Sequence, residues 1–337
     1  MSIFSKLLKG AGGLLGLTVA GLGGYAAYAS ATFESRLFFP DTPYPAIKAS
    51  TDPEVIERGR YLARGPAHCS QCHSSPDREH PERIKDTTLP LSGGLLFDMG
   101  PVGRGQSANL TSDPVTGIGK LTDQDIARTI RTGVRSTGEL SVMMVFVAKP
   151  SDEDLTAIVS YLRSLEPTSN EIPKAEWGLL GKMLFPMLPF RPAAGVAPKG
   201  VPASAEASVE RGEYLAESIA LCTTCHTAMN PMTAAFEGPK AGGSYAEPSH
   251  GADSDMEFVA PNLTSDPTGI TGKLTEDQFV ARIQGGRAYP SSIMPWENFG
   301  LATEADLRSI YRYLHSLPPI QNDTGPSYRK IGWKAGE

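Results

Sequence analysis

A five-residue motif occurs twice in this chain and constrains the fold more strongly than any other feature. The residues that define the two C-x-x-C-H copies are Cys69, Cys72 and His73 in the first and Cys222, Cys225 and His226 in the second. The 337-residue chain has four cysteines, so the two motifs use all of them. This pattern is the attachment signature of haem c, because both thiols and the imidazole must reach one porphyrin from a single turn. A redox dithiol or half of a zinc site could explain one copy, but the pair favours two covalent haems.

The motifs belong to a longer internal repeat. The sequence E-R-G-R-Y-L-A at 57–63 returns as E-R-G-E-Y-L-A at 210–216, and the offset of 153 residues is the same as that between the motifs. The sequence N-L-T-S-D-P recurs at 109–114 and 262–267 with the same offset. A period of this length indicates a duplicated domain, because solenoid repeats are only about 20–50 residues long.

Each copy is predicted to be mostly helical. A proline and an acidic residue after Asp52 are typical of the first turn of a helix. Ser151 and Thr303 are each followed three residues later by an acid and then by apolar residues at helical spacing, which predicts a closing helix in each copy. Gly59 and Gly212 would permit a close helix crossing, although a helix can also simply tolerate a glycine.

The N-terminal segment is predicted to be a membrane anchor. Lys6 and Lys9 precede an uncharged stretch at 10–32, which is long enough as a helix to cross a bilayer of roughly 30 Å. The lysines place that end in the cytoplasm and the haem domains in the periplasm. A cleaved signal peptide is the alternative, because A-x-A patterns occur at 27–31. Small residues at every fourth position from Gly12 to Gly24 could also pack against a partner helix.

The expected architecture is therefore a mostly α protein with two tandem haem domains behind one N-terminal transmembrane helix. The expected segments are an anchor at 1–35, a tether at 36–51, the first domain at 52–166, a linker at 167–204, the second domain at 205–318 and a tail at 319–337. The linker contains an apolar run at 177–190, which is expected either to pack on a haem domain or to meet the membrane or a partner. The net charge of −6 gives no indication of nucleic-acid binding.

The second axial ligand of each iron is expected to be a methionine before the closing helix. In the second copy this is Met294, which precedes Pro295 and Trp296. In the first copy, alignment of Phe146 with Trp296 selects Met144, whereas alignment of an aliphatic–Met pair selects Met143; we favour Met144. The remaining histidines suit a ligand role less well: His68, His80, His250 and His315.

Taken together, these motifs resemble the cytochrome c subunits of membrane-bound bacterial dehydrogenases that oxidise alcohols, sugars or aldehydes. The resemblance is carried by the two C-x-x-C-H motifs, the N-L-T-S-D-P sequences, the T-G-I sequences that follow them, and M-P-W at 294–296. It covers residues 52–166 and 205–318. It implies class I cytochrome c folds with His/Met-ligated haems. The alcohol and gluconate dehydrogenase subunits typically carry three such motifs, whereas this chain has two, and its first domain lacks Met-Pro.

The leading functional hypothesis is electron transfer through two haems, between a periplasmic dehydrogenase or quinol-oxidising complex and a respiratory acceptor. The expected partners are a dehydrogenase subunit and an oxidase or soluble cytochrome, at the inner membrane. The alternatives are a dihaem enzyme of the peroxidase or thiosulfate dehydrogenase type, or a subunit of a terminal oxidase or respiratory supercomplex. The chain lacks a nucleophile elbow, a P-loop and a zinc-protease helix, so no catalytic residue is predicted.

Overall fold

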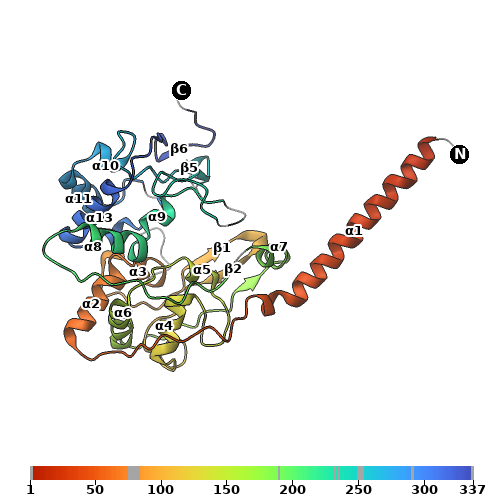
Figure 1. Ribbon diagram of the computed structural model, residues 1–337. Coiled ribbons are helices and arrows are strands. Elements are labelled where there is room, and N and C mark those ends of the chain that lie inside the picture. Colours follow the sequence, from red (N-terminus) through yellow and green to blue (C-terminus); the bar gives the residue numbers. More distant parts are fainter. Residues whose placement is uncertain are drawn as a thin grey trace.

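The computed structural model describes residues 3–74, 84–188, 190–230, 233, 235–248, 254–289 and 292–334. Figure 1 shows two lobes, one for each repeat, and a long N-terminal helix that extends away from them. The fold is mostly helical, as the sequence predicts.

The first repeat and its flanking segments contain helices α1 (Ile3–Arg36), α2 (Pro53–Arg64), α3 (Cys69–His73), α4 (Asp123–Thr132), α5 (Val142–Val145), α6 (Asp152–Ser164) and α7 (Leu179–Leu184), and the 3-10 turns η2 (Gly100–Val102) and η3 (Phe185–Met187). The second repeat contains helices α8 (Val209–Tyr214), α9 (Cys222–Cys225), α10 (Ile270–Lys273), α11 (Glu276–Gln284), α12 (Trp296–Phe299) and α13 (Glu304–Ser316), and the π-helical segment η4 (Leu215–Ile219). The strands are β1 (Leu96–Asp98), β2 (Gly103–Gln106), β3 (Glu176–Trp177), β4 (Glu247–Pro248), β5 (Met256–Phe258) and β6 (Tyr328–Lys330).

The first and last helices of each repeat cross at a glycine. A Cβ atom on Gly59 of α2 would lie 1.9 Å from the main-chain oxygen of Ala157 in α6. The same distance separates a Cβ on Gly212 of α8 from the oxygen of Ser309 in α13. Both glycines are therefore required for the close crossing that the sequence predicts, because any side chain would collide with main-chain atoms.

The predicted helix starts are also confirmed. The Asp52 side chain accepts a hydrogen bond from the main-chain nitrogen of Glu54 at the start of α2. Ser151 and Thr303 cap the closing helices by accepting from the nitrogens three residues later. These caps satisfy main-chain donors that the first turn of a helix leaves free.

Each repeat carries a small antiparallel sheet. Strand β2 pairs with β1 and β3 in the first repeat, and β5 pairs with β4 and β6 in the second. The third strand of each sheet, β3 or β6, follows the closing helix. It lies in the segment that the sequence analysis assigns to the linker or the tail.

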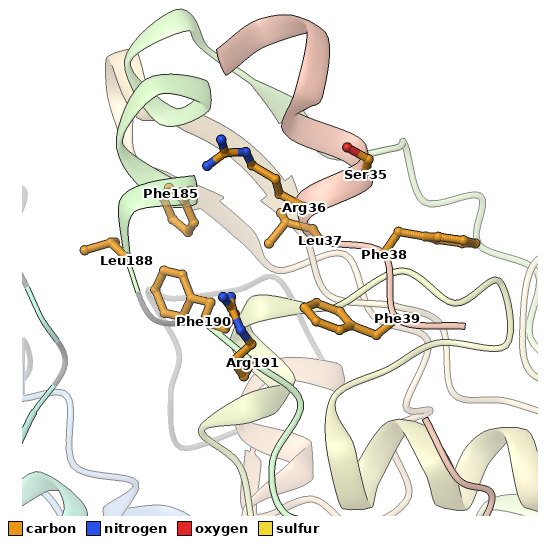
Figure 2. Close-up of a pocket in the computed structure, with 9 residues that line it drawn as sticks. All are labelled: Ser35, Arg36, Leu37, Phe38, Phe39, Phe185, Leu188, Phe190 and Arg191. Carbon is orange, nitrogen blue, oxygen red and sulfur yellow. The ribbon is translucent and has the colours of Figure 1, made fainter. Parts of the chain in front are cut away.

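The apolar part of the linker packs on the end of α1 and on the first repeat. The Trp177 ring lies 5.2 Å from that of Phe33 in α1 and 4.6 Å from that of Phe185. The Tyr25 hydroxyl of α1 donates to the Met183 oxygen over 2.7 Å. A hollow of about 240 Å³ lies beside these contacts, and the side chains of Arg36 and Phe190 are among those that line it (Figure 2).

The predicted transmembrane helix corresponds in position to α1, which spans 34 residues. Within the part of the chain that the structure describes, no helix is both long enough and apolar enough to cross a membrane.

The two lobes pack against each other through one hydrophobic core and a reciprocal set of polar contacts. Buried residues of both repeats, such as Leu62 and Leu215, belong to the same apolar cluster. The Tyr61 hydroxyl of the first repeat donates to Asp306 of the second over 2.6 Å. The Tyr214 hydroxyl of the second repeat donates to Asp154 of the first over 2.7 Å. The duplicated sequence thus produces a pseudo-two-fold interface.

Candidate functional site

A left-handed residue precedes each C-x-x-C-H motif. His68 has φ of 41° and Leu221 has φ of 55°, and each is the N-cap of the short helix that carries the cysteines, α3 or α9. Residues other than glycine rarely adopt this left-handed backbone conformation. The same uncommon turn in both repeats directs the chain into the motif, so the two motifs share one local geometry.

The histidine of each motif is oriented by a main-chain oxygen. The Nδ1 atom of His73 lies 2.7 Å from the oxygen of Ala108, and that of His226 lies 2.8 Å from the oxygen of Pro261. A carbonyl oxygen can only accept, so Nδ1 is the protonated nitrogen and Nε2 keeps its lone pair. Burial lowers the pKa of both imidazoles, against the opposing effect of these hydrogen bonds. Each ring is therefore neutral and held as a metal-ligating histidine normally is.

The N-L-T sequence holds the carbonyl that orients the histidine. The buried Asn262 directly follows Pro261; its Oδ1 accepts from the nitrogen and hydroxyl of Thr264, and its Nδ2 donates to the oxygen of Ile320 over 2.6 Å. In the first repeat, the buried Asn109 makes the equivalent bonds, to Thr111 and to the oxygen of Thr168. The asparagine thus connects the loop beside the histidine to the chain beyond the closing helix.

All four cysteines lie in the described residues, and none of them forms a disulfide. Burial raises the pKa of the Cys69 and Cys222 thiols to about 12, and the second thiol of each motif adds to the effect. Burial also raises the pKa of Cys225. These thiols are protonated at neutral pH, which does not suit a redox dithiol, because such a group depends on a lowered thiol pKa.

Met294 lies in a braced loop directly before α12. It is half-buried and packs against the core cluster. The Trp296 indole nitrogen donates to the Ser292 hydroxyl over 3.1 Å, and the guanidinium of Arg282 lies 4.0 Å from the Trp296 ring centroid. The loop is therefore fixed on both sides of the methionine.

A buried ion pair that the sequence analysis missed closes the same loop. Arg287 contacts the carboxylate of Glu297 over 2.7 Å, and their side chains are only 10% and 5% exposed. Arg287 also donates to the main-chain oxygen of Ser292. Arg287 lies in the loop after α11 and Glu297, ten positions later, in the single-turn helix α12, so no helical or strand pattern indicates that they meet.

The first-repeat loop is built differently. Met143 and Met144 both lie in the single-turn helix α5; Met143 is 53% exposed, whereas Met144 is half-buried. The ammonium of Lys149 donates to the main-chain oxygens of Met144 and Ile130 over 2.9 and 3.0 Å. Burial lowers the pKa of Lys149 to about 8, and the nearby Arg131 contributes. The sequence analysis did not identify this lysine.

The other histidines are placed as follows. The His68 ring lies edge-on to that of Phe299 in the second repeat, with centroids 5.8 Å apart. His315 is exposed and stacks on Tyr311. His80 and His250 lie outside the described residues.

The second repeat also contacts the first attachment motif directly. The side-chain nitrogen of the buried Asn298 in α12 donates to the hydroxyl of Ser70 over 2.7 Å and to the oxygen of Arg64 over 2.6 Å. Ser70 lies between the two cysteines of the first motif. Asn298 follows Met294 by four positions, and Ser70 lies in the same short helix as His73. The hydrogen bond between Asn298 and Ser70 therefore connects the Met294 loop to the helix that carries His73.

The residues of the two motifs fit haem c. Each motif supplies two thiols and one oriented imidazole on a single turn. In the described ranges, no group of three or more His, Cys, Asp or Glu side chains is placed to hold a metal ion.

Comparison with known proteins also indicates a c-type cytochrome. The chain resembles the cytochrome c subunits of dehydrogenases. It is 28% identical to the cytochrome c subunit of the quinone alcohol dehydrogenase of Gluconobacter oxydans, over 85% of this chain and 58% of that protein. It is 29% identical to the cytochrome c subunit of the gluconate 2-dehydrogenase of Pantoea cypripedii, over 78% of this chain and 59% of that protein. A dihaem c-type cytochrome of Cereibacter sphaeroides is 24% identical, over 75% of this chain and 83% of that protein.

These similarities confirm the resemblance that the motifs predict. The chain spans less than three-fifths of the length of the two dehydrogenase subunits. No protein-family profile matches the chain.

Proposed function

We propose that this chain is an electron-transfer protein with two covalently bound haem c groups, acting between a dehydrogenase and a respiratory acceptor. The observation that carries the proposal is the matched pair of histidine rings, in which Nδ1 donates to a main-chain oxygen and the lone pair is on Nε2. The names of the relatives support the same role. When bound, the haem iron would supply one-electron redox chemistry, and the chain would supply attachment, ligands and an apolar surrounding.

The proposed attachment and ligand residues are those expected from the sequence. Cys69 and Cys72 would hold the first haem, with His73 and Met144 as axial ligands. Cys222 and Cys225 would hold the second, with His226 and Met294. The half-buried position of Met144 and the exposure of Met143 support the choice between them.

Covalent attachment is tested by mass spectrometry of the denatured chain, produced in a host that makes c-type cytochromes. We expect a mass increase of two haems, and of one haem in a Cys222→Ser/Cys225→Ser variant. The matched control is Thr224→Ala, which changes the motif but keeps C-x-x-C-H and both haems. An unmodified chain would contradict the proposal.

Axial ligation is tested by the long-wavelength charge-transfer band that a methionine–iron bond gives in the oxidised protein. We expect Met294→Leu and Met144→Leu each to remove half of the band. Met143→Leu is the matched control and should leave the band intact. If Met143→Leu removed half of it instead, the first-repeat assignment would move to Met143. A band from only one haem in the unmodified protein would favour the dihaem-enzyme alternative.

We further infer that α1 attaches the protein to the bacterial inner membrane, with the haem lobes in the periplasm. Figure 1 shows this helix extending away from both lobes, and apolar side chains along it, such as Leu17 and Val19, are 74% and 62% exposed. At its end, the guanidinium groups of Arg36 and Arg191 line the hollow in Figure 2 together with phenylalanine rings, a combination suited to a bilayer surface. We expect the full chain to stay in the membrane pellet after alkaline washing, and a chain that begins at residue 37 to be released. Release of the full chain would contradict the anchor.

The proposed donor is a periplasmic dehydrogenase, and the acceptor is an oxidase or a soluble cytochrome. Purification of the native protein in mild detergent should recover a dehydrogenase with it. Absence of any redox partner under these conditions would contradict this part of the proposal.

A further inference from the structure

One position beside the attachment motif carries opposite charges in the two repeats. Arg64 follows the repeated sequence E-R-G-R-Y-L-A in the first repeat, and Glu217 follows its counterpart in the second, with the same offset of 153 residues. Each lies five residues before the first cysteine of its motif. The two haem domains, otherwise so alike, therefore differ in charge at equivalent places.

Among the residues that the structure describes, no carboxylate pairs with Arg64, which is a buried cation. The residue is 2% exposed; its Nε donates to the Tyr161 hydroxyl over 2.8 Å, and its Nη2 donates to the oxygen of Leu89 over 2.6 Å. Its Nη1 is buried without a hydrogen-bond partner, and in the described part of the chain no acidic side chain pairs with it. Both of these partners are neutral, so no described acidic side chain compensates its positive charge. Such a charge is costly to bury.

Glu217 occupies the equivalent place with the opposite charge. Its carboxylate accepts from the hydroxyl of Tyr313 over 2.5 Å and from the hydroxyl of Thr223 over 2.9 Å. Tyr313 is the counterpart of Tyr161, so the tyrosine that accepts from a cation in the first repeat donates to an anion in the second. Lys240 lies 3.2 Å away, but its side chain is 56% exposed, so solvent screens it more than the carboxylate, which is 26% exposed.

Both charges act on the attachment motifs. Thr223 lies between the two cysteines of the second motif, so Glu217 is hydrogen-bonded to the attachment turn itself. Burial is the main cause of the raised pKa of Cys69 and Cys222; beyond it, Arg64 favours the thiolate of Cys69, whereas Glu217 disfavours that of Cys222. The two side chains thus impose opposite electrostatic potentials at the two sites where haem would be bonded.

We propose that Arg64 and Glu217 order the two haems in reduction potential, with the first-repeat haem the higher. This inference rests on the proposed function. Reduction adds one electron to a haem, so a nearby cation stabilises the reduced form and a nearby anion the oxidised form. In a molecule that holds one electron, the first-repeat iron is therefore reduced and the second-repeat iron oxidised. Transfer from the second repeat to the first is the downhill direction.

The test is a spectroelectrochemical titration of the purified holoprotein and its variants. We expect Arg64→Gln to lower the higher of the two midpoint potentials, and Glu217→Gln to raise the lower one. Each change should alter the ratio of reduced to oxidised haem by about tenfold at fixed applied potential, which is about 59 mV for a one-electron couple. The double variant should bring the two midpoints together.

Three control variants separate charge from structure. Arg64→Lys keeps the charge and should keep the higher midpoint near its original value. Arg60→Gln removes a positive charge and Glu213→Gln a negative charge, each four residues before Arg64 or Glu217. Glu213 is exposed, and Arg60 pairs with Glu57 at the surface. They should leave both midpoints almost unchanged.

The proposal would be overturned if Arg64→Gln moved the lower midpoint, or if Arg64→Gln and Glu217→Gln moved neither. Failure of the proposed function has a different signature, because a chain without covalent haem has no midpoints to titrate. Glu217→Gln keeps the size of the side chain and an acceptor oxygen, so it tests the proposal even if Arg64→Gln does not fold.

Discussion

At the scale of single residues, the asparagine of each N-L-T sequence has a physical role beside the C-x-x-C-H motif. Asn262 is fully buried and uses both its oxygen and its nitrogen in hydrogen bonds. It follows Pro261, whose oxygen accepts from the His226 ring. Asn262 therefore helps to hold the main-chain oxygen that orients His226. Its loss should affect both the stability of the lobe and the orientation of the ring.

We expect Asn262→Ala to lower the free energy of unfolding by about 1–3 kcal/mol, because it leaves buried main-chain groups without partners. Urea denaturation followed by circular dichroism measures this change. Added imidazole should also replace His226 more easily as the proposed axial ligand of the second haem. Gln321→Ala, an exposed change in the neighbouring segment, is the control. A loss as small as that of the control would contradict the role assigned to Asn262.

At the scale of secondary-structure elements, the sequence predicts what is encoded locally. The helix starts at Asp52, Ser151 and Thr303 and the close glycine crossings could be predicted, because caps and apolar spacing depend on neighbouring residues. The small sheets could not, because strands of two to four residues are too short to show a periodic pattern. The Arg287–Glu297 pair was missed for a similar reason, since it joins a loop residue to the single-turn helix α12, which is too short to show a periodic pattern.

The reversed charges at Arg64 and Glu217 could have been found from the sequence, because aligning the two repeats places them opposite each other. The burial of Arg64 and the partial burial of Glu217 could not, since they depend on how the closing helices pack. Similarly, the hydrogen bond between Asn298 and Ser70 joins residues 228 positions apart, and no local pattern predicts it.

The glycine crossings give a prediction at this scale. We expect Gly212→Ala to destabilise the second lobe by roughly 1–3 kcal/mol, because the added methyl group would push α8 away from the main chain of α13. The shift also moves η4, which continues α8 towards the attachment motif, so haem incorporation should fall. Thermal unfolding and the haem content per chain measure the two effects.

The control for that change is Gly195→Ala in the linker, where a Cβ atom would meet nothing within 4 Å. It should leave both the melting temperature and the haem content almost unchanged. If Gly212→Ala were equally harmless, the close approach of α8 and α13 would not be needed for the fold.

At the scale of the whole molecule, the duplicated halves are tied together by exchanged contacts. Asp306 is paired with Arg211 inside its own lobe over 2.9 Å and also accepts from Tyr61 of the other lobe. Asp154 is paired with Arg58 in the same way and accepts from Tyr214. Each aspartate thus stabilises its own helix pair and the interface together, which couples the unfolding of the two lobes.

We expect a Tyr61→Phe/Tyr214→Phe variant to uncouple the lobes, because it removes both exchanged hydrogen bonds to charged groups, each contributing about 1.5–3 kcal/mol. Calorimetry should show a lower first transition, and two transitions in place of one. Tyr311→Phe is the matched control: it removes a tyrosine hydroxyl that bonds only within the second lobe, to Leu274 and Thr271.

The same tyrosines predict how the interface responds to alkaline pH. Burial, followed by the nearby Asp306, raises the pKa of Tyr61 from 10 to about 12. Burial and Asp154 likewise raise the pKa of Tyr214. The unfolded chain therefore releases these protons at a lower pH than the folded chain does. The stability contributed by the neutral phenols is complete below pH 10 and is lost as the pH rises towards 12.

This loss should appear as a fall in melting temperature between about pH 10 and 12 that is steeper in the unmodified protein than in the Tyr61→Phe/Tyr214→Phe variant. Tyr311→Phe should retain the steep fall, because both interface phenols remain. Equal slopes in the unmodified protein and the double variant would show that other groups govern the alkaline transition. Because the exchanged bonds join the two lobes, the rate of electron exchange between the two proposed haems should change over the same pH interval, and pulse radiolysis can follow it.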